Sequence, residues 1–473
     1  MTADRSDHAP TTPYPGRSTG ASTDAAPGTA TAAAPATATP PASTPAATVR
    51  SLAPDLARGM LLLFIASANV WGYLWNTSGE ASRYGLRPVG GSSLDVAVDG
   101  VVAFFVDDRS RPMFAILYGF GLATMAARLA ARGADPRQVR RVIARRSGWL
   151  VVFGVVHAAL LFAGDILAPY GVTGLIALAF LQRSRTVLLW WFWGASILAT
   201  AGGALVLTFL HEFWGTGEIP PSDYLVSVVE RLFGSLAITT IAALLLFFVP
   251  QVVLGILLAR SGWLARPWEH RQALGRVVVV ALVVNLVGNL PFALAVAQVW
   301  TPADGAVGLT VELAHYLSGV VMGLGYVCLF AWVAAVLGDR PRHGVVSAVA
   351  ATGERSLTSY LLQSVMFAPL LSAWGLGLGG RIGTAQAAVL AIVVWLVTVL
   401  VAVAMHRAGR RGPFEVLLRR LTYGRGGSPA AVVVAQHPHA AEPPVAGRQP
   451  PTAGHDAPPR GSAGAPPLSG AWG

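Results

Sequence analysis

The sequence predicts an all-α fold: a polytopic transmembrane helical bundle of about ten helices, with both termini in the cytoplasm. Three observations lead to this prediction. Of the 473 residues, 54% are hydrophobic and only 12% are charged. Long apolar runs follow one another through the middle of the chain. The arginines that separate these runs gather in every second connection.

The two ends of the chain differ in composition from its middle. Residues 1–51 consist mainly of small residues, proline and threonine, which cannot bury enough apolar surface to fold. They predict a disordered cytoplasmic tail. Residues 424–473 return to a Pro/Gly/Ala-rich composition and predict a second such tail. The predicted transmembrane domain is therefore 52–423.

A transmembrane helix needs about 20 apolar residues, and this length divides the middle of the chain. The expected spans are 56–75, 112–131, 143–163, 166–181, 186–210, 228–258, 274–299, 308–337, 356–373 and 385–405. The first connection, 76–100, and the connections at 211–227, 300–307 and 374–384 are then expected on the outer side. The turn between the third and fourth spans lies on that side too.

Arginine alone gives the chain its positive charge, +11 net, because no lysine occurs. These arginines lie between apolar runs, which is typical of membrane topology and not of a nucleic-acid surface, so no nucleic-acid partner is predicted. The expected cytoplasmic connections contain Arg137, Arg140, Arg141, Arg145, Arg146, Arg183, Arg185, Arg260, Arg266, Arg271, Arg276, Arg340, Arg342, Arg407, Arg410, Arg411, Arg419 and Arg420.

His157 and Asp165 are the leading candidate functional residues. An ionisable side chain in a membrane helix usually faces a bundle interior or a cavity and has a function. The two would lie about 12 Å apart on a continuous helix, but a break at Gly164 allows the carboxylate to fold back toward the imidazole. Asp165 has a second interpretation as the N-cap of the next helix. Both interpretations remain open at this point.

A second group of charges, Asp107, Asp108, Arg109 and Arg111, precedes the second span. One interpretation is a solvated loop whose charges pair with one another. The other is an anion site, in which the Arg111 guanidinium binds a carboxylate or phosphate with two hydrogen bonds.

Further polar residues fall inside the expected spans. Glu312 and His315 are three residues apart and share one face of a helix, but this spacing has no matching copy in the chain, so no metal site is predicted. Asn69, Tyr360 and Gln363 are expected either to bond between helices or to line a polar cavity with His157. The one cysteine, Cys328, is expected to be a packing residue.

Five segments of the chain resemble motifs of the YeiB-like family of bacterial polytopic membrane proteins. The first contains Arg58, Gly59 and Asn69 and reads PDLARGMLLLFIASANVWGY. The others read RPMFAILYGFGLA, RRSGWLVVFGVVHAALLFAGDILAPYGVTGLIAL, GERSLTSYLLQS and RRGPFEVLLRRLTYG. The resemblance implies a multi-pass protein of the bacterial plasma membrane, with the family's C-terminal domain of unknown function at about 231–423.

The Arg-Gly opening is also similar, more distantly, to that of the transmembrane acyltransferase superfamily. This similarity implies an enzyme that moves an acyl group from a cytoplasmic donor, such as acyl-CoA, to a small molecule or envelope glycan at the outer face. His157 would act as general base or acyl carrier and Asp165 would orient it. Arg58 would bind donor phosphates and Arg111 the acceptor. The alternative function is a transporter of a small anionic solute, with a proton relay formed by His157, Asp165, Glu312 and His315.

Overall fold

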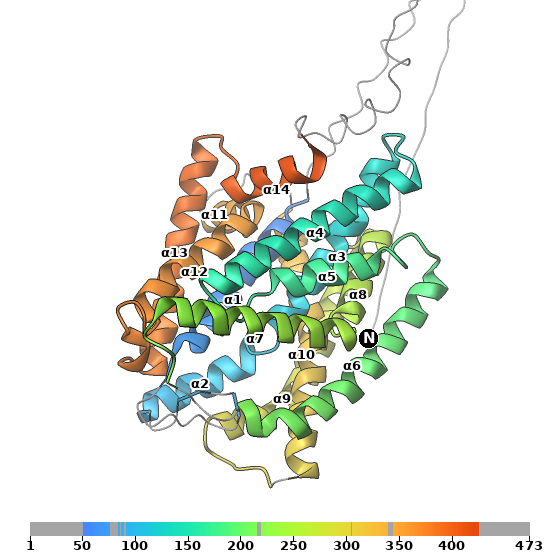
Figure 1. Ribbon diagram of the computed structural model, residues 1–473. Coiled ribbons are helices and arrows are strands. Elements are labelled where there is room, and N and C mark those ends of the chain that lie inside the picture. The colour runs from blue at the N-terminus through green and yellow to red at the C-terminus, as the bar shows by residue number, and fades with distance from the viewer. Residues whose placement is uncertain are drawn as a thin grey trace, which may run out of the picture. The chain divides into compact units, whose positions relative to one another are not determined.

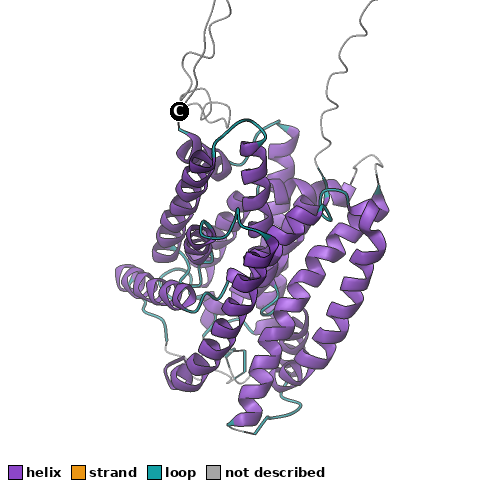
Figure 2. Ribbon diagram, turned by 90° about the vertical axis from the view of Figure 1, so that its right-hand side faces the viewer, coloured by secondary structure: helices purple, strands orange, loops and turns teal. Residues whose placement is uncertain are grey.

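The structure is a computed structural model that describes residues 51–75, 84–85, 87–88, 91–214, 219–303, 305–338 and 344–424, with side chains from 207 to 214 excluded. These residues form helices joined by short connections, and no β-strand occurs among them. Most of the helices run in roughly the same direction (Figure 2). The described residues do not include 1–50 and 425–473, which are nearly all of the two predicted tails. They also do not include 339–343, the connection that contains Arg340 and Arg342.

The helices follow the order of the predicted spans, with several additions. They are α1 (Ala53–Val70), η1 (Trp71–Tyr73), α2 (Ser93–Phe105), α3 (Ser110–Ala130), α4 (Pro136–Leu160), α5 (Leu167–Ala177), α6 (Arg185–Trp214), α7 (Tyr224–Leu244), α8 (Val249–Ser261), η2 (Pro267–His270), α9 (Arg271–Val296), α10 (Ala306–Leu337), α11 (Gly344–Glu354), α12 (Ser356–Leu371), η3 (Leu378–Gly380), α13 (Thr384–Arg407) and α14 (Pro413–Tyr423).

Eight helical segments in the described part of the chain are long and apolar enough to cross a membrane, counting α2 and α3 together as one broken segment. Three further apolar helices, α5, α8 and α12, are shorter. Large apolar side chains are exposed along several of these helices, including Trp190 on α6, Val287 on α9 and Leu400 on α13. Exposed apolar surface of this extent is expected in contact with lipid and not with water. The chain is therefore a helical membrane protein.

The basic connections meet at one end of the bundle, which we call the basic end. Ser51, just before α1, donates a hydrogen bond to Leu264 O, and Arg260 donates to Arg183 O. Arg145 donates to Leu421 O of α14, which joins the start of α4 to the C-terminal helix. α14 lies at the top of the bundle in Figure 1. Positively charged connections gathered at one end are what the positive-inside rule expects of a membrane protein.

The opposite end, which we call the hairpin end, contains the turn between α4 and α5. Tyr73 of η1 donates a hydrogen bond to Leu161 O in this turn, and Tyr224 at the start of α7 donates to Leu160 O. Asp95, at the start of α2, accepts a hydrogen bond from Ala385 N at the start of α13. α2 lies at the lower left in Figure 1, far from α14.

Two differences from the predicted spans have clear local causes. The expected 76–100 connection contains most of α2, which begins with a capping box between Ser92 and Asp95. The expected single span 228–258 is two helices, because the chain turns between Leu244 and Val249, with Leu246 at a φ of 51°. Pro250 then occupies the first turn of α8, where its missing N–H costs no helical hydrogen bond.

Candidate functional site

The turn from Leu161 to Ile166 joins α4 to α5 and folds the two helices against each other. α5 and its following turn run back along α4, because Arg140 near the start of α4 donates a hydrogen bond to Leu178 O. Gly154 permits this close packing: a Cβ at that position would overlap the Asp165 carboxylate and the Ala168 backbone nitrogen. The helix pair thus holds His157 of α4 directly beside the turn.

His157 and Asp165 form a buried hydrogen-bonded pair. His157 Nδ1 lies 2.8 Å from Asp165 Oδ1, and both side chains are almost completely buried. Asp165 also accepts a hydrogen bond from Ala168 N at 2.8 Å through Oδ2, which satisfies one of the amides that the first turn of α5 leaves without a helical partner. The two interpretations of Asp165 are therefore compatible, since one oxygen caps the helix and the other orients the imidazole.

Tyr360 of α12 completes this group. Its hydroxyl donates a hydrogen bond to Asp165 Oδ1 at 3.3 Å and accepts one from Ile166 N at 3.4 Å. The Tyr360 ring lies 5.1 Å from the His157 ring, centroid to centroid. Because His157 Nδ1 donates its hydrogen bond to Asp165, the neutral imidazole has its lone pair on Nε2. That Nε2 atom is buried and has no hydrogen-bond partner.

α12 itself is fixed in place from the basic end. Glu415 of α14 accepts hydrogen bonds from Leu357 N at 2.7 Å and Thr358 N at 3.0 Å, so it caps α12 from another helix. Gln363, one turn beyond Tyr360, donates through Nε2 to Leu62 O of α1, while its buried Oε1 has no partner. The two C-terminal motifs found in the sequence thus meet in the structure, and together they position Tyr360 and Gln363.

A cavity of about 410 Å³ opens at the hairpin end, and Leu161 to Gly164 form part of its wall. His157 lies one helical turn before Leu161, so the cavity and the buried pair share the α4–α5 turn. Arg231 of α7 lines the cavity and donates to Ala159 O and Leu160 O at the end of α4. The side chains in its lining that can contact a polar, partly apolar ligand are Tyr73, Trp75, Phe162, Glu230, Arg231 and Trp374.

A second polar network lies at the break between α2 and α3. Arg109 is fully buried there and donates from Nε and Nη2 to Asn285 Oδ1 of α9, at 3.1 and 2.9 Å. Arg87 is also buried, and it pairs with Asp107 at 2.7 Å and with Asp99 at 3.0 Å, the latter without hydrogen-bond geometry. Paired, hydrogen-bonded charges are the form in which charge can be kept inside a protein.

His315 of α10 is part of the same network and contacts residues of α9 and of the break between α2 and α3. Its Nε2 lies 3.0 Å from Asp108 Oδ2, and its Nδ1 lies 2.6 Å from Asn289 Oδ1 and 3.2 Å from Arg109 Nη1. Its ring stacks on Phe292 with centroids 3.7 Å apart. The anion-site interpretation singled out Arg111, but its half-exposed side chain pairs with Asp108, while Arg109 is the buried guanidinium.

The remaining predicted residues lie apart from these contacts. Arg58 is partly exposed on α1 and pairs with Asp55 at 3.4 Å, toward the basic end. Asn69 is half-buried near the end of α1, and no contact among the described residues joins its side chain to either network. Glu312 is half-buried on α10, and no cluster of three metal-binding side chains is found in the described part of the chain.

Arg87 falls in the expected outer connection 76–100, and the sequence left Arg109 and Asp107 between two interpretations. All three belong to the buried network, because α2 and the long α9 and α10 surround the break. The signal that could have found them is the Ser92-x-x-Asp95 capping box before the apolar run 96–106, which predicts a helix in place of a loop.

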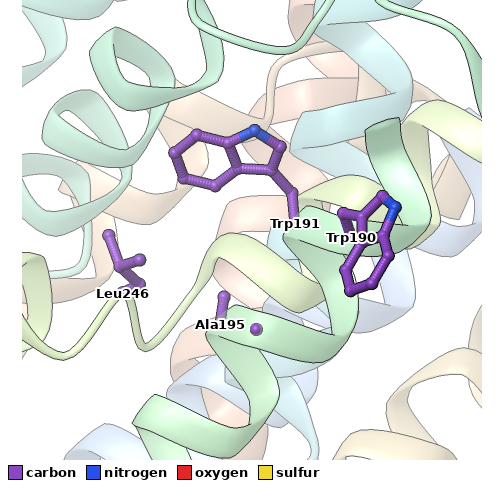
Figure 3. Close-up of a pocket in the computed structure, with 5 residues that line it drawn as sticks. Trp190, Trp191, Ala195 and Leu246 are labelled. Carbon is purple, nitrogen blue, oxygen red and sulfur yellow. The ribbon is translucent and has the colours of Figure 1, made fainter. Parts of the chain in front are cut away.

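A further hollow is apolar, and no residue of either network lines it. It has a volume of about 330 Å³ and lies between α6 and the turn that separates α7 from α8. Figure 3 shows Trp190, Trp191 and Ala195 on α6, with Leu246 on the turn. Trp190 is largely exposed, as expected for a side chain in contact with lipid.

Comparison with known proteins identifies a family and several relatives. Residues 258–425 match the family model described as "Protein of unknown function (DUF418)". The chain is 26% identical over 360 residues to Bacillus subtilis YxaH, covering 70% of this chain and 83% of YxaH. It is 30% identical over 334 residues to Escherichia coli YeiB, covering 67% of this chain and 82% of YeiB. Both relatives are described as uncharacterized. The chain belongs to the YeiB-like family.

Proposed function

We propose that this protein is an acyltransferase of the bacterial plasma membrane, in which His157 is the general base. The observation that carries the proposal is the unpartnered, buried Nε2 of His157, on an imidazole whose Nδ1 is held by Asp165. One ring nitrogen fixed by a carboxylate and the other available for a proton is the arrangement that general-base catalysis requires.

The reaction has a simple balance of atoms. His157 Nε2 removes the proton from an acceptor hydroxyl, and the oxygen forms a bond to the acyl carbon of a thioester donor such as acyl-CoA. The carbon–sulfur bond breaks, and the imidazolium returns the proton to the leaving thiolate. Asp165 stabilises the imidazolium through Nδ1 and stays ionised, as in other carboxylate–histidine pairs. The unpartnered Gln363 Oε1 and the ring of Tyr360, which lies beside His157, are the proposed substrate contacts.

The orientation of the protein in the membrane follows from its charge. We infer that the basic end and both termini face the cytoplasm. Arg58 and the other arginines of that end are the proposed binding residues for the phosphates of the donor. The hairpin end then faces outward, and the cavity beside the α4–α5 turn receives the acceptor, a small molecule or an envelope glycan. Arg111, Asn69 and Glu312 are proposed contacts for an acceptor that approaches from this side.

The test compares acylated envelope components in cells that lack the gene and in cells that express variants. Wild type is expected to restore acyl esters that His157→Ala and Asp165→Asn do not. The matched control is His406→Ala on α13, a mostly exposed histidine at the basic end. Equal restoration by His157→Ala and wild type, at equal protein levels, would overturn the proposal.

Transport of a small anionic solute is the second candidate, and one observation favours it. The break between α2 and α3 carries the buried Arg109 within a membrane-crossing segment, and transporters commonly bind solutes and ions at discontinuous helices. Proton-coupled flux in vesicles without any acyl donor would support transport. In that case His157→Ala would leave acyl esters unchanged.

A further inference from the structure

The hydrogen-bonding groups around His315 determine where its protons lie. Asn289 has a fixed orientation, because its Nδ2 donates to Ala103 O at 3.1 Å and to Phe104 O at 3.0 Å. These carbonyls belong to the last turn of α2, where a helix leaves carbonyls without helical partners. Asn289 therefore presents its oxygen, an acceptor, to His315 Nδ1 at 2.6 Å. At that distance a hydrogen must lie between the two atoms, so Nδ1 carries one.

The other ring nitrogen also faces an acceptor. His315 Nε2 lies 3.0 Å from Asp108 Oδ2, and a carboxylate only accepts hydrogen bonds. A neutral imidazole has one N–H and cannot donate to both Asn289 and an ionised Asp108. The contacts are satisfied if the ring is an imidazolium, or if Asp108 is protonated and donates to Nε2. Both descriptions contain one proton more than a neutral histidine with an ionised aspartate.

We propose that Asp108 and His315 form a proton-binding site at the break between α2 and α3, occupied by one shared proton in this conformation. The charged groups that face the site are three arginines and four carboxylates. From the α2–α3 side they are Arg87, Asp99, Asp107, Asp108, Arg109 and Arg111, and from α10 Glu312; α9 contributes only the neutral Asn285 and Asn289.

Loss of the proton changes the partner of Nδ1. The remaining N–H lies on Nε2 toward the Asp108 carboxylate, and Nδ1 becomes an acceptor. Arg109 Nη1, a donor 3.2 Å away, then replaces Asn289 as its partner. Asn289 holds the end of α2, whereas Arg109 immediately precedes α3. Proton release therefore moves the hydrogen bond of His315 Nδ1 from Asn289 of α9 to Arg109 at the start of α3.

This inference does not depend on the proposed acyl transfer, since Asp108 and His315 take no part in that reaction. The test uses the full chain in lipid nanodiscs, with histidine rings labelled with ¹⁵N and the His315 signals identified by their loss in His315→Gln. At neutral pH we expect Nδ1 to be protonated. We also expect either a protonated Nε2 or an infrared band of a carboxylic acid that Asp108→Asn removes.

A second variant tests the switch without removing either proton-binding residue. Asn289→Ala removes the acceptor, so Nδ1 is expected to become unprotonated and accept from Arg109. Asn69→Ala, at an asparagine outside both networks, is the matched control and should leave the His315 signals unchanged. The proposal fails if wild-type His315 has an unprotonated Nδ1 and a protonated Nε2, with no band that depends on Asp108. If His315→Gln does not fold, the ring signals that move in Asn289→Ala identify His315.

Discussion

Replacing Asp165 with asparagine leaves one acceptor oxygen where the native side chain uses two. In the native pair, Oδ1 accepts from His157 Nδ1 and Oδ2 accepts from Ala168 N, each at 2.8 Å. The asparagine amide nitrogen must face one of these two groups. The hydrogen on Ala168 N is fixed to the backbone, whereas an imidazole can move its hydrogen from one nitrogen to the other. We therefore expect the oxygen to stay on Ala168 and the amide NH₂ to face His157.

This rearrangement has a calculable cost and a defined chemical effect. The helix cap is kept, since asparagine caps as well as aspartate does. The hydrogen bond from His157 to a charged carboxylate is lost, and such bonds contribute about 1.5–3 kcal/mol. The variant should therefore be less stable than wild type by about 1–3 kcal/mol. The His157 hydrogen moves to Nε2, so that the atom proposed as general base can no longer accept a proton.

Two measurements check this reasoning. ¹⁵N spectra of labelled histidine should show Nδ1–H in wild type and Nε2–H in Asp165→Asn, and the denaturation midpoint in detergent should fall. Asp223→Asn on α7 is the matched control, because Asp223 caps that helix through Val226 N and touches no histidine among its described contacts. Its stability should change little. An unchanged His157 tautomer together with an unchanged midpoint in Asp165→Asn would refute the description of the pair.

Substitutions at three further positions, two of them with a control variant, test the surroundings of the pair. Tyr360→Phe removes two hydrogen bonds between α12 and the α4–α5 turn, each worth about 0.6 kcal/mol inside a membrane, and a loss above about 2 kcal/mol would contradict this estimate. Gly154→Ala should separate α4 from α5 and destabilise the protein by about 1–3 kcal/mol, measured by thermal unfolding. Gly148→Ala on the same helix is the control: its new Cβ meets no atom within 4 Å, so it should stabilise the protein by up to about 1 kcal/mol. Equal effects of the two glycine variants would contradict the close packing of α4 on α5 at Gly154. Glu415→Ala should lower the stability of the protein by about 1–2 kcal/mol, because α12 loses its cap, and Glu415→Gln should lower it less. Hydrogen exchange at the Leu357 and Thr358 amides measures the effect, and unchanged exchange in Glu415→Ala would exclude the cap.

Much of the fold could be predicted because membrane helices leave a strong signal in sequence. Long apolar runs give the crossing helices, and arginine clusters give the end at which their connections meet. The point at which a helix ends inside a long apolar run is harder to predict from the sequence. The turn at Leu246 contains no glycine that would indicate it in the sequence. The available signal was Pro250, because proline is favoured in the first turn of a helix and here lies at the start of α8.

The candidate site was partly predictable for a related reason. His157 and Asp165 stand out in the sequence because ionisable residues are costly in lipid, and Gly164 indicated the turn that brings them together. Tyr360 could be named as a polar residue at membrane depth, but its contact with Asp165 depends on how α12 packs, which no local pattern encodes. Arg87 and Arg109 were harder still, because a charged residue near a connection is usually solvated, and here the neighbouring helices bury it.

The most direct measurement is acyl transfer by the purified protein in lipid nanodiscs. Acetyl-CoA labelled in its acetyl group supplies the donor, and a total envelope extract supplies lipid and glycan hydroxyls as acceptors. Wild type is expected to label the extract, and His157→Gln to do so about 10² to 10⁴ times more slowly, the usual contribution of a general base. Transfer by His157→Gln at the wild-type rate, or no transfer by wild type, would contradict the assignment of His157 as the base.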